Sequence, residues 1–294
     1  MEELRKHAKE LLENKTVAAI LGYVEVDPKR TRPAVITKPE DASKLVFNEY
    51  CLNNLAVYLT KARIKNIAKQ NGAVMKLGIV AKPCDIHSVI ALIQESQLKR
   101  EDIHIIGMNC HGVVKDFGME FSGETLASKC VPCESHKPLY HDIVLGEEKQ
   151  TPSVSDEVLA KIQAIEKMTY EERFEYFKNE FDKCIKCYAC RAACPLCYCQ
   201  RCITDKTIPR WIESSPHSRG NFSWNVVRAF HLSGRCIGCG ECERACPMDI
   251  PLSLLNRKMA ETAKEAYAYV SGRSLETPTL VGSYDVKDSD ELFM

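Results

Sequence analysis

The sequence has little that would direct it to a membrane, to nucleic acid or to the secretory pathway. No apolar run in its 294 residues is long enough to cross a bilayer. The N-terminal segment from Met1 to Glu10 is charged and has no apolar core of the kind found in secretion signals. The 40 basic side chains balance the 40 acidic ones, so no global field favours a polyanionic partner. We therefore expect a soluble, cytoplasmic protein that binds no nucleic acid and has no membrane span.

Common signatures of catalysis and of nucleotide binding are also missing. The sequence shows no Walker loop, no Ser–His–Asp triad and no carboxylate pair. Its 14 glycines include no Gly-rich phosphate-binding fingerprint, since Gly238 and Gly240 flank a cysteine in a cysteine-rich loop. A phosphate-bearing cofactor needs such glycines, because only bare backbone lets N–H groups approach its oxygens. We therefore assign no catalytic residue.

Cysteine, in contrast, is abundant, with 16 residues in the chain. Disulfide-rich scaffolds are small and carry secretion signals, which we do not find here. We therefore interpret the cysteines as metal ligands in a reducing cytosol or in an anaerobe.

Eight of the cysteines form two copies of one pattern, C-x-x-C-x-x-C-x-x-x-C-P. The first copy is Cys184, Cys187, Cys190 and Cys194, with Pro195 behind it. The second copy is Cys236, Cys239, Cys242 and Cys246, with Pro247 behind it. This is the ligand run of two-cluster bacterial ferredoxins, in which the fourth cysteine of each run ligates the other cluster. The stretch resembles a dicluster ferredoxin domain, except that a long segment, 195–235, separates the two runs.

The pattern therefore assigns two [4Fe–4S] clusters. The first cluster takes Cys184, Cys187, Cys190 and Cys246. The second cluster takes Cys236, Cys239, Cys242 and Cys194. Structural zinc is the alternative, because zinc sites also use C-x-x-C pairs, but two complete runs without histidine favour iron–sulfur clusters.

The chain before these runs alternates strand and helix patterns. Apolar and β-branched runs predict strands at 17–26, 33–37, 76–80, 103–108 and 141–145. Apolar periodicity predicts helices at 2–14, 52–70 and 86–97. A strand, a crossover helix and a second strand are typical of a parallel α/β sheet. We predict an α/β domain with a small, mostly parallel sheet over residues 1–150.

The rest of the chain is divided by composition and by the cysteine runs. We predict a helical linker over 151–180 and an α-rich dicluster ferredoxin domain over 181–270. The segment 271–294 is polar with scattered apolar residues, and forms either an ordered strap or a loose tail.

Four further cysteines are far apart in the sequence. Cys84 and Cys110 follow two predicted strands, at the carboxyl ends where open α/β sheets place their ligands. Cys130 and Cys133 form a C-x-x-C pair in a polar loop. The four cysteines could converge on a third metal, or each could be a small buried hydrophobe.

Four short motifs around these cysteines occur in register. They are Lys82-Pro-Cys-Asp-Ile-His, Ile105-Ile-Gly-Met-Asn-Cys-His-Gly-Val, Lys129-Cys-Val-Pro-Cys and His141-Asp-Ile-Val-Leu-Gly-Glu. Over residues 30–148 the chain resembles the β-subunit family of coenzyme F420-reducing hydrogenases and formate dehydrogenases. The resemblance implies that Cys84, Cys110, Cys130 and Cys133 ligate a third [4Fe–4S] cluster.

The same resemblance implies FAD and hydride exchange with F420. Members of the family have a Ser-Gly-Gly-like turn before the Pro-Cys strand, whereas this chain has Glu49-Tyr-Cys-Leu-Asn-Asn54 there. FAD binding is therefore left open. Without a flavin the chain can pass only single electrons.

The remaining candidates have both a structural and a functional interpretation. Cys197, Cys199 and Cys202 are packed thiols, or they hold an additional metal with an outside ligand. His87 and His111 either donate hydrogen bonds to cluster sulfurs, which would raise the potential, or simply pack at strand ends.

These observations favour an iron–sulfur electron-transfer subunit of an anaerobic redox complex, with about three [4Fe–4S] clusters. It would relay single electrons between another acceptor and a partner subunit. The partner would be a flavoprotein, or a hydrogenase, formate dehydrogenase or heterodisulfide-reductase-like subunit. One alternative is an FAD-containing oxidoreductase subunit acting on F420 or NAD(P)H. The other is a structural zinc protein.

Overall fold

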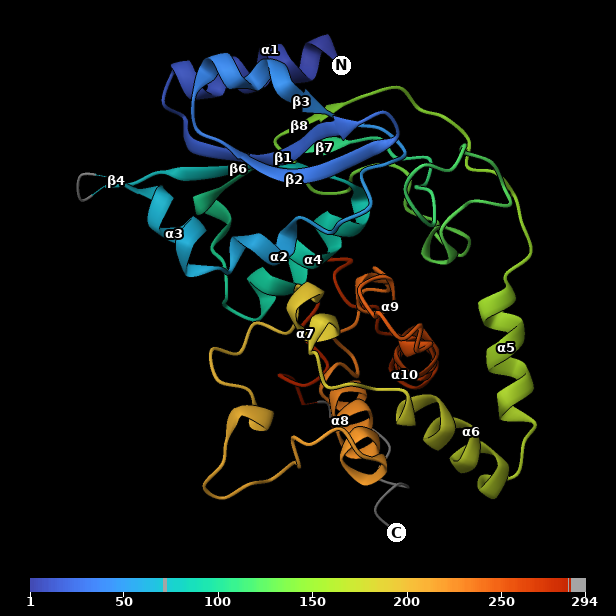
Figure 1. Cartoon of the computed structure of the whole chain (residues 1–294). Coiled ribbons are helices and arrows are strands. Elements are labelled where there is room, and N and C mark those ends of the chain that lie inside the picture. The colour runs from blue at the N-terminus through green and yellow to red at the C-terminus, as the bar shows by residue number, and fades with distance from the viewer. Residues whose placement is uncertain (71–72, 285, 287–294) are drawn as a thin grey trace.

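The computed structural model describes residues 1–70, 73–284 and 286. It has an N-terminal region, from α1 to β8, built on a sheet, and a C-terminal helical region, from α5 to α10 (Figure 1). The predicted fold class, a mostly parallel α/β sheet followed by an α-rich region, is confirmed. None of the described helices is both long and apolar enough to span a membrane.

The main sheet has six strands in the order β2-β1-β6-β7-β8, with β3 also paired to β1. The strands are β1 (Val17–Asp27), β2 (Arg30–Ile36), β3 (Leu45–Val46), β6 (Lys76–Ala81), β7 (Ile103–Met108) and β8 (Ile143–Leu145). Strands β1, β6, β7 and β8 run parallel to one another, whereas β2 and β3 run antiparallel to β1. The carboxyl ends of β6 and β7 therefore lie side by side. A separate hairpin pairs β4 (Lys69–Gln70) with β5 (Ala73–Val74).

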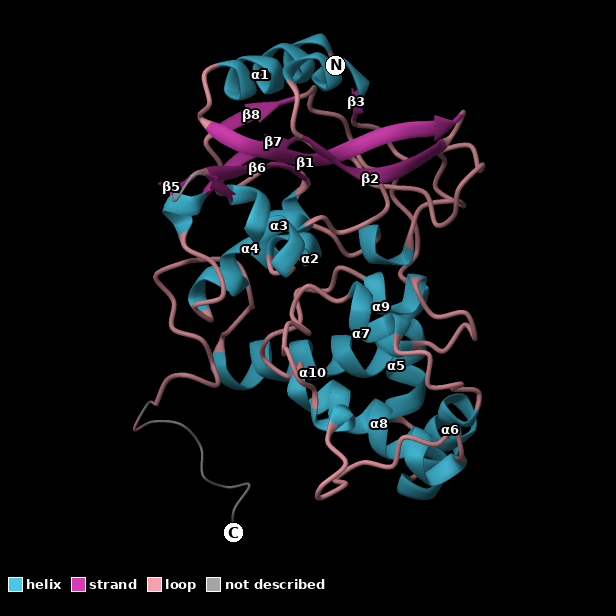
Figure 2. Ribbon diagram, turned by 60° about the vertical axis from the view of Figure 1, so that its left-hand side comes forward, coloured by secondary structure: helices cyan, strands magenta, loops and turns pink. Residues whose placement is uncertain are grey.

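One face of the sheet is covered by α1 (Glu2–Glu13) and the 3₁₀ helix η1 (Pro39–Lys44). The predicted apolar stripe of α1 is buried there, and consists of Leu4, Ala8, Leu11 and Leu12. Figure 2 shows α1 on the side of the sheet opposite to the other helices.

The other face of the sheet is covered by α2 (Ala56–Leu59), α3 (Ala62–Ala68) and α4 (Pro83–Gln94). The prediction of one helix over 52–70 is wrong, because extended backbone at Lys61 separates α2 from α3. The N–H of Leu55 donates to the Asp85 carboxylate at 3.2 Å, so the chain before α2 is held by a tertiary contact and not by helical bonds. The predicted helix end at Asn71-Gly72 lies outside the described residues.

Helix α4 begins three residues earlier than the apolar pattern predicts. Pro83 occupies its first turn, where a missing N–H costs nothing. The Asp85 carboxylate accepts a hydrogen bond from the N–H of Lys82 at 2.9 Å and so caps the helix. Cys84 therefore lies in the first helical turn after β6.

The C-terminal region contains longer helices and short helices at the cysteine runs. They are α5 (Glu157–Glu166), α6 (Tyr170–Asp182), α7 (Ala189–Ala193), α8 (Ser218–His231), α9 (Glu241–Arg244) and α10 (Leu252–Tyr267). The 3₁₀ helix η4 (Ile203–Asp205) also lies in this region, whereas η2 (Arg100–Asp102) and η3 (Ser128–Cys130) lie in the N-terminal region. The apolar core of this region surrounds Phe181, Trp224 and Ile250. The two cysteine runs meet at this core, which also contains Cys190 and Cys242.

Residues 271–277 of the polar segment after α10 form an ordered strap. The amide of Gln94 on α4 donates to the carbonyls of Ser274 and Thr277, at 2.8 and 2.6 Å. Gly272 has a positive φ of 73°, and an added Cβ there would collide with the carbonyl oxygen of His87. Only glycine therefore lets the strap lie against the start of α4. The expectation for 285 and for 287–294 falls outside the described residues.

Candidate metal centres

Cys84, Cys110, Cys130 and Cys133 line one cavity of about 430 Å³, which we call the first cavity. Cys84 comes from the first turn of α4, and Cys110 follows β7. The C-x-x-C pair lies in and after η3. Other lining residues include Lys82, Lys129 and His136. The structure thus brings together Cys84, Cys110, Cys130 and Cys133.

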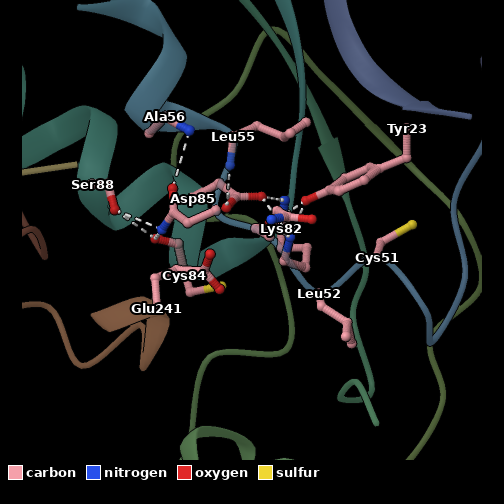
Figure 3. A network of polar contacts seen from close by, with 12 residues as sticks. Tyr23, Cys51, Leu52, Leu55, Ala56, Lys82, Cys84, Asp85, Ser88 and Glu241 are labelled. Carbon is pink, nitrogen blue, oxygen red and sulfur yellow. Dashed lines mark hydrogen bonds and ion pairs between the residues drawn. The ribbon is translucent and has the colours of Figure 1, made fainter. Parts of the chain in front are cut away.

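A buried ion pair fixes the backbone next to Cys84 (Figure 3). Lys82 is 1% exposed, and its Nζ lies 3.1 Å from the Asp85 carboxylate. The same ammonium group donates to the carbonyl of Asn53 at 2.7 Å and to the hydroxyl of the buried Tyr23. A buried charge is tolerated when it is paired and hydrogen-bonded in this way.

A second contact holds Cys84 from the side of α2. The amide of Asn54 donates to the hydroxyl of Ser88 at 2.9 Å and to the carbonyl of Cys84 at 3.3 Å. Asn54 and Ser88 are both buried, so this contact is shielded from water. The backbone carbonyl of Cys84 is therefore held both by Asn54, which lies before α2, and by Ser88, which is on the same helix as Cys84.

Burial disfavours thiolates in the first cavity. It raises the pKa of the Cys110 thiol to about 11, and it also raises the pKa of Cys84 and of Cys133. The positive charges of Lys82 and Lys129 oppose this effect at Cys84. A metal must bind cysteine as the thiolate, so these cysteines fit a site in which a cationic metal supplies the remaining compensation.

A second cavity, of about 330 Å³, is lined by Cys194, Cys236, Cys239 and Cys242. These are the four cysteines that the ferredoxin pattern assigns to the second cluster. Arg228 and Asn256 also line the cavity. The amide of Asn256 donates to the sulfur of Cys242 at 3.6 Å.

Cys239 lines both cavities, together with its neighbours Gly238 in the first and Gly240 in the second. Gly240 has a positive φ of 67°, and an added Cβ would lie 3.2 Å from the side chain of Lys129. The second cysteine run therefore packs directly against the cysteine pair of the N-terminal region. The two candidate sites are adjacent.

Three cysteines assigned to the first cluster, Cys184, Cys190 and Cys246, share the core of the C-terminal region. Cys187 is exposed. Lys186 and Tyr188, on either side of it, both have a positive φ of 57°. These are costly conformations for residues with a Cβ.

Buried polar contacts hold that loop in place. The Nζ of Lys186 donates to the carbonyls of Glu213 and Gly220 at 2.9 and 2.8 Å. The amide of Asn221 donates to the carbonyl of Cys184 at 2.7 Å. The long segment between the runs thus supports the first run.

Within the described residues, no three His, Cys, Asp or Glu side chains are placed to hold a single metal ion.

The three leftover cysteines lie in different surroundings. Cys197 packs against the core of the N-terminal region, and its N–H donates to the carbonyl of Cys194 at 3.2 Å. Cys199 is exposed. Cys202 packs in the core of the C-terminal region. This placement favours packed thiols at Cys197 and Cys202, and the additional metal stays a prediction.

Neither predicted histidine is among the residues that line the two cavities. His87 lies under the strap, and its Nε2 is buried with no hydrogen-bond partner in the described part of the chain. His111 packs edge-on against Phe121. The histidine that lines the first cavity is His136, which sequence reasoning missed, although it follows Cys133 at a ligand-like spacing of three. The cluster hydrogen bonds predicted for His87 and His111 stay a prediction.

The segment Glu49–Asn54, which stands where the family has a glycine turn, offers few free donors to a flavin phosphate. The N–H groups of Tyr50, Cys51 and Leu52 already donate within the segment or to Asn48. Its carbonyls at Leu52 and Asn53 accept from Lys129 and Lys82. A phosphate needs free N–H donors, and three of the N–H groups in this segment are already engaged.

Comparison with known proteins agrees with the cysteine geometry. Residues 183–251 match the family model of the 4Fe-4S dicluster domain. The chain is therefore an iron–sulfur protein, and its dicluster domain implies two [4Fe–4S] clusters.

Relatives of the whole chain are found among archaeal redox subunits. The β-subunit of the F420-dependent formate dehydrogenase of Methanocaldococcus jannaschii is 27% identical over 290 residues, which covers 70% of this chain and 76% of that protein. The β-subunit of the F420-dependent formate dehydrogenase 1 of Methanococcus maripaludis is 22% identical over 363 residues, which covers 93% of this chain and 91% of that protein. The predicted resemblance is confirmed: the chain is similar to β-subunits of F420-dependent formate dehydrogenases, and it carries a 4Fe-4S dicluster domain.

Part of the chain also matches solved structures. One of them is the F420-reducing [NiFe] hydrogenase complex from Methanosarcina barkeri, with 18% identity, a TM-score of 0.28, and coverage of 38% of this chain and 42% of that one.

Proposed function

We propose that this chain relays single electrons through three [4Fe–4S] clusters between a formate dehydrogenase- or hydrogenase-type subunit and a second acceptor. The cluster in the first cavity is held by Cys84, Cys110, Cys130 and Cys133. The other two clusters are those of the dicluster domain, with the ligands that the two runs assign.

The observation that carries this proposal is the position of Cys239, which lines both cavities. A cluster in the first cavity and the second cluster are separated by the loop around this residue. The first cluster is adjacent to the second, because Arg228 lines the second cavity and also donates to the carbonyl of Cys190 at 3.2 Å. Cys190 is one of the ligands assigned to the first cluster. The three sites therefore form a series, from the N-terminal region to the far side of the dicluster domain.

The protein residues hold this series in place and exclude water from it. The pair of Lys82 and Asp85 fixes the first turn of α4, and the pair of Lys129 and Glu241 joins the two regions. When bound, each cluster supplies a site that accepts and returns one electron.

The far end of the series reaches the surface. Cys187 is exposed, and Ile185 and Met248, close to it and to Cys246, are 53% and 36% exposed. An exposed ligand flanked by apolar side chains suits contact with a redox partner. The partner's class is taken from the relatives, whose names describe F420-dependent formate dehydrogenases.

Anaerobic purification followed by metal, sulfide and flavin analysis tests the proposal. We expect about twelve irons and about twelve sulfides per chain, with no flavin released on denaturation. About eight irons would limit the chain to its dicluster domain and remove the third cluster. A released flavin would support the FAD-containing alternative, and zinc without sulfide would support the structural one.

A further inference from the structure

Arg228 of α8 is a buried cation between the two cysteine runs. Its side chain lines the second cavity, and the residue is 4% exposed. One of its guanidinium nitrogens, Nη2, donates to the carbonyl of Cys190 at 3.2 Å. The guanidinium group thus contacts a residue assigned to the first cluster while it faces the cavity assigned to the second.

This arginine has no carboxylate partner in the described part of the chain. Other arginines of the region do: Arg191 pairs with Asp205, Arg244 with Glu241, and Arg257 with Asp156. The Nε of Arg228 is buried and has no hydrogen-bond partner among the described residues. An unpaired buried cation is costly, so a native fold is expected to compensate it.

The residues around Arg228 include cysteines from both runs. Its side chain lines the cavity of Cys194 and Cys242, and it donates to the carbonyl of Cys190. Cys190 belongs to the first cluster, and Cys194 and Cys242 belong to the second. The compensating negative charge therefore comes from both sites at once.

We propose that Arg228 is a counter-charge shared by the two clusters of the dicluster domain, and that it raises the reduction potential of both. This inference rests on the ligand assignment of the proposed function. Reduction adds one electron to a cluster and neither forms nor breaks a bond, so the reduced cluster carries one more negative charge. A fixed cation in a water-poor interior stabilises that charge. Because Arg228 adjoins both clusters, it also offsets the repulsion between an electron on one and an electron on the other.

The test is a potentiometric titration of the purified full chain, followed by EPR, with sodium dithionite as the reductant. Arg228→Met removes the charge, and Arg228→Lys keeps it without the planar fork. Arg257→Met is the matched control, because Arg257 pairs with Asp156 at the α5–α10 contact and lines neither cavity. At the wild-type midpoint potential of each dicluster signal, we expect Arg228→Met to lower the ratio of reduced to oxidised cluster at least tenfold. For a one-electron couple this corresponds to a fall in the midpoint potential of about 59 mV. Arg228→Lys and Arg257→Met should stay near the wild-type midpoint.

The outcomes separate this inference from the proposed function. Unchanged midpoints in Arg228→Met with full iron content overturn the counter-charge role and leave the electron relay intact. A wild-type chain without iron overturns the relay itself, and this inference with it. If Arg228→Met loses its clusters, Arg228→Lys decides: clusters in the lysine variant support a requirement for charge. Loss in both, with clusters retained in Arg257→Met, shows that the arginine is needed only for its shape.

Discussion

The Nζ of Lys129 lies 3.3 Å from a carboxylate oxygen of Glu241, and both side chains are buried. Lys129 precedes the first cysteine of the C-x-x-C pair, and Glu241 precedes Cys242 in the second run. This ion pair therefore joins the loop that lines the first cavity to the loop that lines the second. The lysine also donates to the carbonyl of Leu52 at 3.0 Å, so the pair is tied to the segment that precedes α2.

We expect Glu241→Gln to destabilise the contact between the two regions. Removal of one partner leaves Lys129 as a buried, uncompensated charge, which typically costs about 3–5 kcal/mol. The measurement is the free energy of unfolding, or the melting temperature, under anaerobic conditions. Glu175→Gln is the control, because the Glu175–Lys178 pair is exposed and such pairs contribute about 0–1 kcal/mol. Equal effects of the two substitutions would contradict a stabilising role for the buried pair.

Cys84→Ala and Cys133→Ala should each remove the cluster of the first cavity. A lost thiolate opens the ligand set, so iron content should fall by about four per chain while the dicluster EPR signals persist. Cys51→Ala is the matched control, since Cys51 is fully buried in the core beside β1 and lines neither cavity. Iron analysis and EPR of reduced samples provide the measurement. Full iron content in both cavity variants would remove the third cluster from the relay.

Asn256→Leu should lower the potential of one dicluster centre and leave the other unchanged. The amide of Asn256 donates to the sulfur of Cys242, and such hydrogen bonds raise the potential by stabilising the more negative, reduced state. A titration that resolves the two signals provides the measurement. Asn256→Asp, which adds a negative charge in nearly the same volume, should lower the same signal further. A shift of both signals, as predicted for Arg228→Met, would contradict a local hydrogen bond.

His87 should make the protein less stable in mild acid. Burial lowers the pKa of its imidazole from 6.5 to about 4. Above pH 6.5 the folded and unfolded states both hold a neutral ring, so stability is full. As the pH falls from 6.5 toward 4, the unfolded state gains a proton that the folded state excludes, and folding loses up to about 3 kcal/mol.

His87→Phe should remove that part of the acid sensitivity, because phenylalanine does not titrate. The measurement is the change in melting temperature between about pH 7 and about pH 5. The wild-type chain should lose more than the variant does. His87→Phe should also keep full iron content and cluster potentials, since the ring lies under the strap and lines neither cavity. Altered potentials would instead support the hydrogen bond to a cluster that the sequence suggests for His87.

Local patterns predict the parts of this protein that depend on neighbouring residues. The stripe of α1 and the strands β6 and β7 follow from apolar periodicity, and the positions of Cys84 and Cys110 follow from where parallel strands end. The pairing of Cys194 with the second run follows from a known ligand pattern. Each of these inferences needs only a few residues or one packing rule.

Features that depend on distant residues could not be predicted in this way. The segment 52–70 has helical periodicity, but Asp85 captures the N–H of Leu55, and extended backbone at Lys61 separates α2 from α3. The burial of Lys82 depends on Tyr23, which lies 59 residues earlier. The double role of Cys239 depends on how two regions pack together, and no spacing within one cysteine run contains that information.

The strap has a consequence for how the protein is made. Residues 271–277 leave the ribosome after every cysteine of this sequence. They bind Gln94, the last residue of α4, and lie against the backbone of His87 near the start of the same helix. Before they arrive, the edge of the N-terminal region beside the first cavity has no cover from this segment. Arg273 of the strap also donates to Ser135, which lines the first cavity. One residue of that lining is therefore held by a segment that is synthesised after all four of its cysteines.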